Sequence, residues 1–131
     1  MLCTFKDPRL TLAMRDAIAR AGYSTPTPIQ VQAIGPILEG RDLIGCAQTG
    51  TGKTAAFAIP TIELLVGADS RLAKLGGAGP RALVLAPTRE LALQTAETFD
   101  MLGRAQGVKT VVLIGANRWG RSSRGSRGDP T

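Results

Sequence analysis

The stretch Gly45–Thr54, GCAQTGTGKT, decides the fold of this 131-residue chain. It follows the apolar pair Leu43-Ile44 and precedes a helical pattern. A strand, a glycine-rich turn and a helix N-terminus therefore come in the order that a nucleotide phosphate-binding loop requires. The plainer interpretation is a Gly/Thr-rich turn with a surface lysine, and the strand and helix on either side argue against it. The stretch predicts a site for a nucleoside triphosphate.

Each residue type in this loop has a chemical reason to be there. Gly50 and Gly52 let the backbone turn sharply and bring its N–H groups against phosphate oxygens. Lys53 supplies a positive charge for the β- and γ-phosphates, and the hydroxyl of Thr54 can bind the Mg²⁺ that bridges them. The general pattern begins with glycine, whereas this chain has Ala47 there. We therefore expect the triphosphate to be bound together with Mg²⁺.

Length and composition indicate one globular domain. The chain is 44% hydrophobic, and no apolar run approaches the roughly 18 residues of a membrane span. We therefore expect no membrane partner. Cys3 and Cys46 could pair only by tying the N-terminus to the phosphate loop, so we expect free thiols and a cytoplasmic protein. Cys46 is expected to be a small buried residue at a strand end.

The net charge of +6 is unevenly distributed along the chain. Residues 1–114 contain 12 Lys or Arg and 9 Asp or Glu, a net charge of +3, and residues 115–131 supply the other +3. The globular part is therefore only mildly basic. Charge alone does not identify a nucleic acid as its partner.

Helices are predicted from the spacing of apolar residues and from capping residues. Gly22 is placed to end the first helix, and Thr27 is placed to cap the second at Pro28. Gly35-Pro36 should interrupt the second helix, and Pro60 should bend the third. The helices are expected over residues 9–21, from Pro28 to the terminating Gly40, and over 53–66 and 89–104.

Three apolar segments without polar alternation predict parallel strands that are buried on both faces. They cover residues 42–47, 81–86 and 108–114 and alternate with the predicted helices. Right-handed crossovers between them give the beginning of a parallel α/β sheet. After Ile114 the hydrophobic period stops, and residues 115–131 are rich in Arg, Gly and Ser. We expect these last residues to form a disordered tail.

Three further features narrow the phosphate loop to one family. Together with the loop, they make the chain resemble the DEAD-box RNA helicase family. Residues 22–30, GYSTPTPIQ, resemble its Q motif, and residues 47–54, AQTGTGKT, resemble its motif I, including the alanine at the start. Residues 87–92, PTRELA, are similar to motif Ia, and Phe5 lies 17 residues before Gly22, where the family has an isolated aromatic residue. The sequence around motif I, LIGCAQTGTGKTAAF at residues 43–57, suggests the bacterial RhlE-like branch.

The resemblance covers about residues 4–115. It implies that residues 1–114 are the N-terminal portion of the helicase ATP-binding domain. The expected fold class is thus α/β, an incomplete RecA-like P-loop NTPase sheet with flanking helices and a disordered tail. In related sheets the phosphate-loop strand pairs with strands that come later in the chain. We therefore expect exposed strand edges and apolar faces, and an isolated chain that is unstable or aggregates.

ATP and Mg²⁺ are the ligands that the resemblance implies for the loop. Gln30 would recognise adenine, because a carboxamide can accept a hydrogen bond from the N6 amine and donate one to N7; the alternative is an ordinary polar residue in a helix's first turn. Phe5 could stack on the base or anchor helix 9–21, and the two roles are not exclusive. The expected ATP-binding residues are Phe5, Gln30, Ala47, Gln48, Thr49, Gly50, Thr51, Gly52, Lys53 and Thr54, the last of which would also bind Mg²⁺.

RNA is the second partner that the resemblance implies. Motif Ia begins at the end of a predicted strand, the edge at which open α/β sheets bind ligands. Thr88, Arg89 and the N–H groups that open helix 89–104 suit phosphate oxygens, and such contacts do not read base sequence. An exposed, ordinary helix start is the alternative for Arg89. The expected RNA-binding residues are Pro87, Thr88, Arg89 and Gly115, where the family's Gly-Gly pair is replaced by Gly115-Ala116.

Hydrolysis of ATP needs carboxylates that hold Mg²⁺ and orient water, and usually an arginine. In the family these come from the Asp-Glu-Ala-Asp motif and a second RecA-like domain, and this chain has no two adjacent acidic residues. We therefore expect no catalytic residue here. The expected function is that of an N-terminal fragment of an ATP-dependent RNA helicase. The alternatives are a non-catalytic module that binds ATP or RNA, and another phosphate-loop ATPase or kinase, for which the Gln30 and PTRELA matches would be coincidence.

The tail, residues 115–131, has two interpretations. It is either out-of-frame or prematurely ended translation of a longer helicase gene, or a genuine Arg/Gly-rich RNA-binding tail. The position of the tail midway through a domain favours the first. The downstream coding DNA, read in three frames, distinguishes the two.

Overall fold

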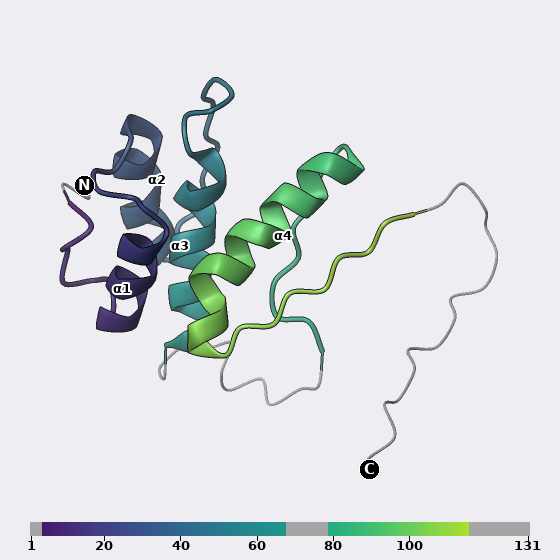
Figure 1. Cartoon of the computed structure of the whole chain (residues 1–131). Coiled ribbons are helices and arrows are strands. Elements are labelled where there is room, and N and C mark those ends of the chain that lie inside the picture. Colours follow the sequence, from purple (N-terminus) through teal and green to yellow (C-terminus); the bar gives the residue numbers. More distant parts are fainter. Residues whose placement is uncertain (1–3, 68–78, 116–131) are drawn as a thin grey trace, which may run out of the picture.

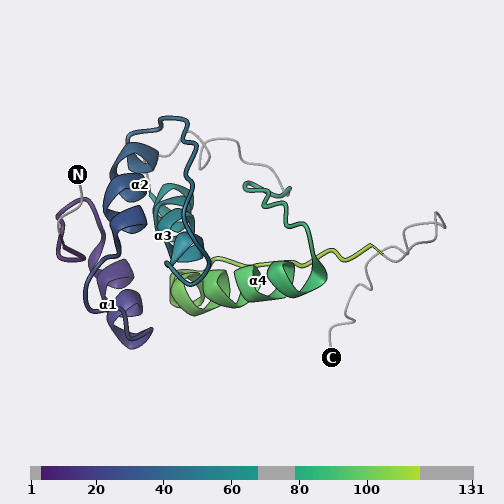
Figure 2. The ribbon, with the colours of Figure 1, turned by 90° about the horizontal axis from the view of Figure 1, so that it is seen from above.

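The computed structural model describes residues 4–67 and 79–115, and in that part of the chain the architecture is helical (Figure 1). Helix α3 runs through the middle, with α1 and α2 on one side and α4 on the other (Figure 2). It packs against both α2 and α4, and α1 packs against α4. The elements are α1 (Leu12–Arg20), α2 (Pro28–Leu38), α3 (Lys53–Val66), α4 (Arg89–Gly103) and the 3₁₀ helix η2 (Arg104–Gln106).

The predicted helices are confirmed, and the capping residues explain their bounds. The hydroxyl of Thr11 accepts a hydrogen bond from the N–H of Met14, so α1 begins three residues later than predicted. At the other end of α1, the N–H groups of Gly22 and Tyr23 donate to Ala19 and Ile18, which are the two bonds of a Schellman motif. Gly40 and Arg41 repeat this pattern at the end of α2.

Helix α2 continues through Gly35-Pro36, so the predicted interruption is wrong. A proline inside a helix loses one backbone hydrogen bond and crowds the carbonyl four residues earlier. Pro36 lies in the last turn of α2, so the lost hydrogen bond falls near the end of the helix. Gly35 is buried, and a Cβ there would lie 3.0 Å from Nη1 of Arg9. The glycine therefore permits the close approach of the arginine.

The hydrophobic core lies between the helices and includes the residues just before α1. A ring pair joins α3 to α4, with the centroids of Phe57 and Phe99 6.1 Å apart. The largest fully buried apolar side chains are Leu10, Met14, Ile18, Ile34, Ile59, Pro60, Ile62 and Leu102. In the part of the chain that the structure describes, no helix is both long and apolar enough to cross a membrane.

A buried carboxylate fixes the start of α1 against α3. Glu63 of α3 is 7% exposed and accepts hydrogen bonds from the N–H and the hydroxyl of Thr11, each at 2.9 Å. A negative charge at a helix N-terminus is stabilised by the unpaired N–H groups and by the helix dipole. The contact spans 52 residues of sequence and positions α1 in the bundle.

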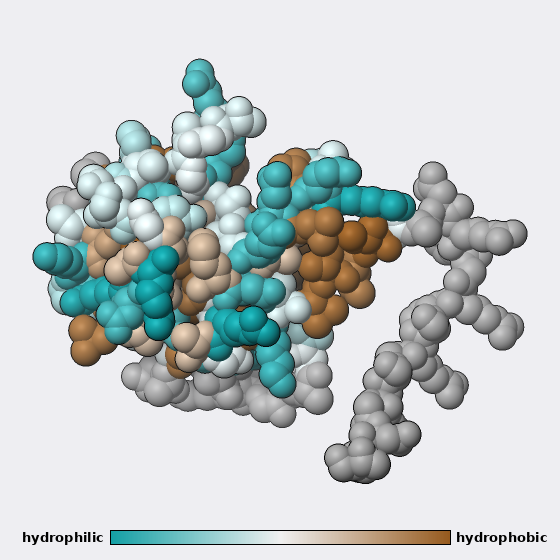
Figure 3. All heavy atoms as spheres, viewed as in Figure 1, coloured by the Kyte–Doolittle hydropathy of each residue, from teal (hydrophilic) through white to brown (hydrophobic). Residues whose placement is uncertain are grey.

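The three predicted strands are not formed: within residues 4–67 and 79–115 no residue is in a β-ladder. Segments 42–47, 81–86 and 108–114 lie outside the helices, and most of their side chains are exposed instead of buried. An apolar patch in Figure 3 lies beside α4, on the side where Figure 1 draws 81–86 and 108–114. The exposed apolar side chains of these segments are Leu43, Ile44, Leu83, Val84, Leu85, Val111, Leu113 and Ile114.

The physical reason for this correction is that a strand exists only through hydrogen bonds to a neighbouring strand. An apolar sequence pattern reports the preference of side chains for burial, and it does not supply the neighbour. The expectation of exposed apolar faces is confirmed. The predicted burial of Cys46 is wrong, because this free cysteine is exposed in the unpaired segment. Cys3, residues 68–78, Ala116 and the tail beyond it lie outside the described residues.

Candidate functional site

The loop before α3 has the backbone of a tight, glycine-dependent turn. Gly50 and Gly52 both have φ of 78°, a left-handed conformation that side-chain-bearing residues rarely adopt. Gly52 is the N-cap of α3, and Lys53 is the first helical residue. The first N–H groups of α3 therefore lie at the end of the loop, where an anion is stabilised.

The side chain of Lys53 folds back over the loop that precedes α3. Its Nζ donates hydrogen bonds to the backbone carbonyls of Ala47 and Gln48, the second at 3.1 Å. The hydroxyl of Thr51 donates to the same carbonyl of Gln48 at 2.6 Å. An ammonium group carries three protons, so one remains for a further acceptor. The positive charge is therefore held at the loop and can still bind a phosphate oxygen.

The Q-motif segment and the loop are in direct contact. Gln30 is 2% exposed; its Oε1 accepts from the N–H of Thr27 at 2.9 Å, and its Nε2 donates to the carbonyl of Gly52 at 3.2 Å. The hydroxyl of Thr27 donates to the carbonyl of Thr51 at 2.7 Å. The structure thus brings together residues that are 22 and 24 positions apart. The sequence predicts neither the contact of Thr27 with Thr51 nor that of Gln30 with Gly52, because no local pattern reports contacts at this separation.

Phe5 has the anchoring role that was one of its two alternatives. It is 7% exposed and belongs to the core cluster that includes Leu10 and Met14. Its ring centroid lies 6.5 Å from that of Tyr23 in a tilted arrangement. Stacking of Phe5 on an adenine base stays a prediction.

The residues predicted to contact RNA form a second, exposed group. The hydroxyl of Thr88 caps α4 by accepting from the N–H of Leu91 at 3.2 Å. Nη2 of Arg89 donates to the carbonyl of Gly115 at 3.2 Å, which joins the two predicted RNA-binding segments across 26 residues. Pro87, Thr88, Arg89 and Gly115 are all exposed. This group is accessible to a large ligand.

The donors at the loop fit a triphosphate with Mg²⁺. Thr54 is half-buried at the second residue of α3, next to Lys53, where its hydroxyl can serve as one metal ligand. In the described residues no three His, Cys, Asp or Glu side chains gather into a metal-binding group. The hydroxyl of Thr54 is therefore one ligand that the described part of the chain offers to Mg²⁺ at the loop.

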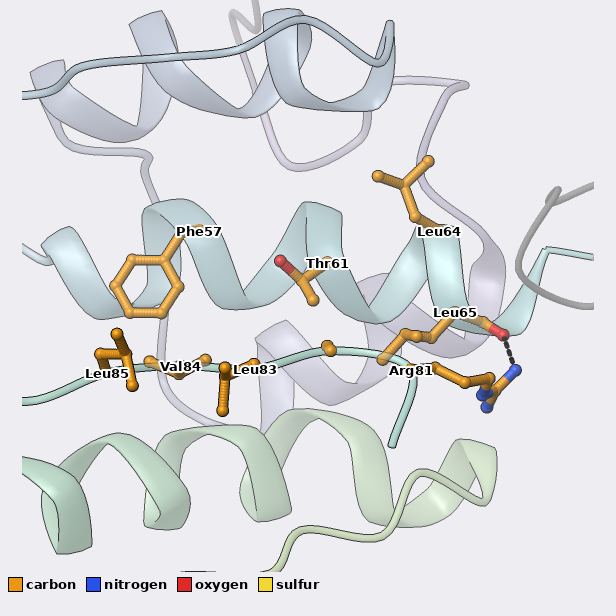
Figure 4. Close-up of a pocket in the computed structure, with 9 residues that line it drawn as sticks. Phe57, Thr61, Leu64, Leu65, Arg81, Leu83, Val84 and Leu85 are labelled. Carbon is orange, nitrogen blue, oxygen red and sulfur yellow. Dashed lines mark hydrogen bonds between the residues drawn. The ribbon is translucent and has the colours of Figure 1, made fainter. Parts of the chain in front are cut away.

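A separate apolar groove runs along α3, away from the loop (Figure 4). Its volume is about 550 Å³, and Phe57, Thr61, Leu64 and Leu65 of α3 line one side. Residues 81–85 line the other side, and Nη1 of Arg81 donates to the carbonyl of Leu65 at 3.0 Å. The groove carries no loop residue, so we do not place the nucleotide there.

Solved structures show what this helical arrangement resembles. The RNA helicase Prp28 from Chaetomium thermophilum, bound to ADP, matches with a TM-score of 0.77 and 37% identity over 89% of this chain and 28% of its own. A DEAD box protein from the hyperthermophile Methanococcus jannaschii matches with a TM-score of 0.66 and 36% identity over 78% of this chain and 26% of its own. The resemblance to DEAD-box RecA-like domains therefore holds although the sheet is not formed.

Curated relatives agree with these structures. The ATP-dependent rRNA helicase RRP3 of Scheffersomyces stipitis is 50% identical over 86% of this chain, and the probable ATP-dependent RNA helicase DDX47 of Homo sapiens is 46% identical over 86%. The chain spans only 22% and 23% of their lengths. These relatives are eukaryotic, so the bacterial RhlE-like branch is not supported. The sequence model of the DEAD/DEAH box helicases matches residues 27–126, and the chain belongs to this family.

Proposed function

We propose that this chain carries the ATP-binding part of an ATP-dependent RNA helicase. The observation that carries the proposal is the joined arrangement of Gln30, Gly52 and Lys53 at the start of α3. Backbone N–H groups and the third N–H of the Lys53 ammonium group would hold the β- and γ-phosphates, while Thr54 would bind Mg²⁺. The bound Mg²⁺ would neutralise charge on the triphosphate. Gln30 has one proton and one lone pair left with which to recognise adenine.

RNA is the second ligand of the proposal. Arg89, Thr88 and the carbonyl of Gly115 form one exposed group at the start of α4. An arginine beside a helix N-terminus suits the phosphates of a nucleic acid backbone. Contacts of this kind position a strand and do not select its bases. We propose sequence-independent binding of RNA, in the cytoplasm.

The chain alone is proposed to bind ATP without hydrolysing it. Phosphoryl transfer requires a group that orients the attacking water and carboxylates that hold Mg²⁺. The sequence has no two adjacent acidic residues. We therefore expect no RNA-stimulated release of phosphate from ATP by the purified chain. Stimulated release would favour a complete catalytic site over the non-catalytic alternative.

Lys53→Ala tests the phosphate-binding part of the proposal. We expect the variant to lose binding of Mg-ATP in titration calorimetry, because the ammonium group that faces the loop is gone. Lys109→Ala is the matched control, since Lys109 is exposed in the segment 108–114. Equal binding by wild type and Lys53→Ala would mean that the phosphates bind elsewhere.

Arg89→Ala tests the RNA part. We expect weaker binding of single-stranded RNAs of any sequence, and a salt dependence that is shallower by about one released ion. The control is Arg104→Ala, another exposed arginine at the far end of α4. A loss that depends on base sequence would contradict backbone contact.

A further inference from the structure

The outer face of α4 is the side of this helix that points away from the buried residues Phe99 and Leu102. Its side chains recur three, four or seven positions apart, so the helix places them side by side. Three are carboxylates, two are apolar, and all are exposed to water. These five residues are Glu90, Leu93, Glu97, Asp100 and Met101. The outer face therefore presents negative charge together with apolar surface.

The carboxylates of this face have no cation beside them in the described residues. The ion pairs of that part of the chain involve Asp7 and Glu39 instead. Arg104 lies one turn beyond Asp100, and the outer face has a net charge of −2 when this arginine is included. The two apolar side chains of the face are each 48% exposed. The face is therefore suited to a partner that is both basic and apolar.

The last described residue lies beside the start of this face. Segment 108–114 runs back along α4 toward its N-terminal end (Figures 1 and 2). The carbonyl of Gly115 accepts a hydrogen bond from Arg89, the residue before Glu90. Sixteen residues follow Gly115 and span at most about 50–60 Å when extended, whereas the 15 residues of α4 are about 22 Å long. The chain beyond Gly115 is therefore long enough to reach the whole outer face.

The residues after Gly115 have the chemistry that the outer face lacks. They include the only tryptophan of the chain and four arginines at intervals of three, namely Trp119, Arg118, Arg121, Arg124 and Arg127. Three extended residues span about 10 Å, which is also the rise between Glu90 and Glu97 along the helix. An arginine binds a carboxylate through two hydrogen bonds, and its stem packs on apolar surface. The spacing of the arginines thus matches that of the carboxylates.

We propose that the arginine-rich segment 116–131 binds the outer face of α4 in the same chain. Its arginines pair with the carboxylates of the face, and Trp119, four residues after Gly115, packs against Leu93. Each ion pair alone is weak, because it is exposed to water. The segment is tethered at Gly115 and so has a high effective concentration beside the helix. Several weak contacts together therefore hold it there.

The fluorescence of Trp119 reports this contact directly, because the chain has no other tryptophan. Quenching by acrylamide is compared between the full chain and a peptide of residues 115–131. At low salt we expect weaker quenching in the full chain. At high salt its quenching should approach that of the peptide, because salt screens exposed ion pairs.

A contact within one chain does not depend on protein concentration. We therefore expect the same quenching at every protein concentration tested. Equal quenching of chain and peptide at low salt would overturn the proposal. Protection of Trp119 that grows with protein concentration would also overturn it, since the contact would then join two copies.

Charge reversal on α4 identifies the surface that is bound. Glu97→Lys combined with Asp100→Lys should raise the quenching of the full chain toward that of the peptide. Each lost ion pair should lower the ratio of bound to free segment by up to about fivefold. The control combines Asp16→Lys with Asp42→Lys, which changes the net charge equally at exposed positions on α1 and before the phosphate loop. Equal effects of the two double variants would overturn the proposal.

Leu93→Ser tests the apolar part of the contact. It should raise the quenching of Trp119 at low salt, whereas Leu12→Ser, which changes a leucine that is 75% exposed on α1, should not. RNA is the alternative ligand for the arginines. A tryptophan that is as accessible as in the peptide until single-stranded RNA is added would show that the segment binds RNA and not α4, and would overturn the proposal.

Discussion

Helix α4 and the segment 108–114 that follows it both carry leucines, but these leucines differ in burial. Leu102 of α4 is fully buried, whereas Leu113 is 89% exposed. A helix satisfies its own backbone and needs a neighbour on only one face. A strand of a parallel sheet needs neighbours for its backbone and for both faces. The four helices can therefore form a core from the residues present, and the three apolar segments cannot.

The largest expected effect tests this contrast with one substitution at two positions. Leu102→Ala should lower the free energy of unfolding by about 2–5 kcal/mol, because it leaves a cavity between packed helices. Leu113→Ala should change the free energy by about 0.5 kcal/mol or less. Urea unfolding followed by the helical circular dichroism signal measures both. Equal losses would mean that the segment 108–114 is packed in solution.

The exposed apolar segments should also govern solubility. Val111 and Leu113 are 79% and 89% exposed, in a segment without a strand partner. Replacing both with serine should raise the fraction of soluble monomer, because unpaired apolar segments promote association. Sedimentation velocity at several concentrations measures the fraction. The control is Leu12→Ser, which changes a leucine that is 75% exposed on α1. A wild-type chain that is already a soluble monomer with a cooperative melt would contradict this expectation.

A smaller loss is expected where a polar contact fixes the packed helices. Glu63→Ala removes the acceptor for the N–H and the hydroxyl of Thr11 and should cost about 1–3 kcal/mol. Glu63→Gln should cost less, since its amide oxygen can still accept. Thermal melts of both variants measure the difference, with the exposed Glu97→Ala on α4 as control. A loss in Glu97→Ala as large as that in Glu63→Ala would show that the contact with Thr11 is not the cause.

The bounds of helices follow from local sequence, which is why they could be predicted. Helix α3 begins and ends where the sequence indicates, because Gly52 is its N-cap and Gly67 is its C-cap. The interruption at Gly35-Pro36 was wrong, because a proline near the end of α2 is tolerated and the glycine accommodates Arg9. The strands failed for a different reason. Their formation depends on partners that a local pattern cannot report.

The candidate site also has one part that local sequence predicts and another part that depends on distant contacts. The loop residues from Ala47 to Thr54 could be found from their order alone, since glycine, lysine and threonine have fixed chemical uses at a phosphate site. The hydrogen bonds from Gln30 and Thr27 to the loop could not, because they cross more than 20 residues and depend on how α2 packs against α3. The roles of these residues toward ATP, and of Arg89 toward RNA, stay predictions.

The smallest expected effect comes from an ion pair at the edge of the packed helices. Nε of Arg9 lies 2.9 Å from Oδ1 of Asp7, and hydrogen bonds from the side chain and the backbone N–H of Arg9 lower the pKa of Asp7 from 3.8 to about 2. Because the folded pKa lies below the unfolded one, the pair stabilises the fold above about pH 4. This stabilisation is lost as the pH falls toward 2. Its size is limited because the guanidinium is partly exposed to water.

Replacing either partner separates this contribution from the rest of the acid response. In Arg9→Met the pKa of Asp7 should return toward 3.8, as followed by the carboxyl carbon signal in an NMR titration. Asp7→Asn should lower stability slightly near neutral pH, and its difference from wild type should shrink as the pH falls through about 2 and vanish below it. Nη1 of Arg9 also lies 3.6 Å from Oε1 of Glu39, so Glu39→Gln is needed as a control for the arginine variant. An Asp7 that titrates at its ordinary pKa in the wild-type chain would show that its pair with Arg9 does not form in solution.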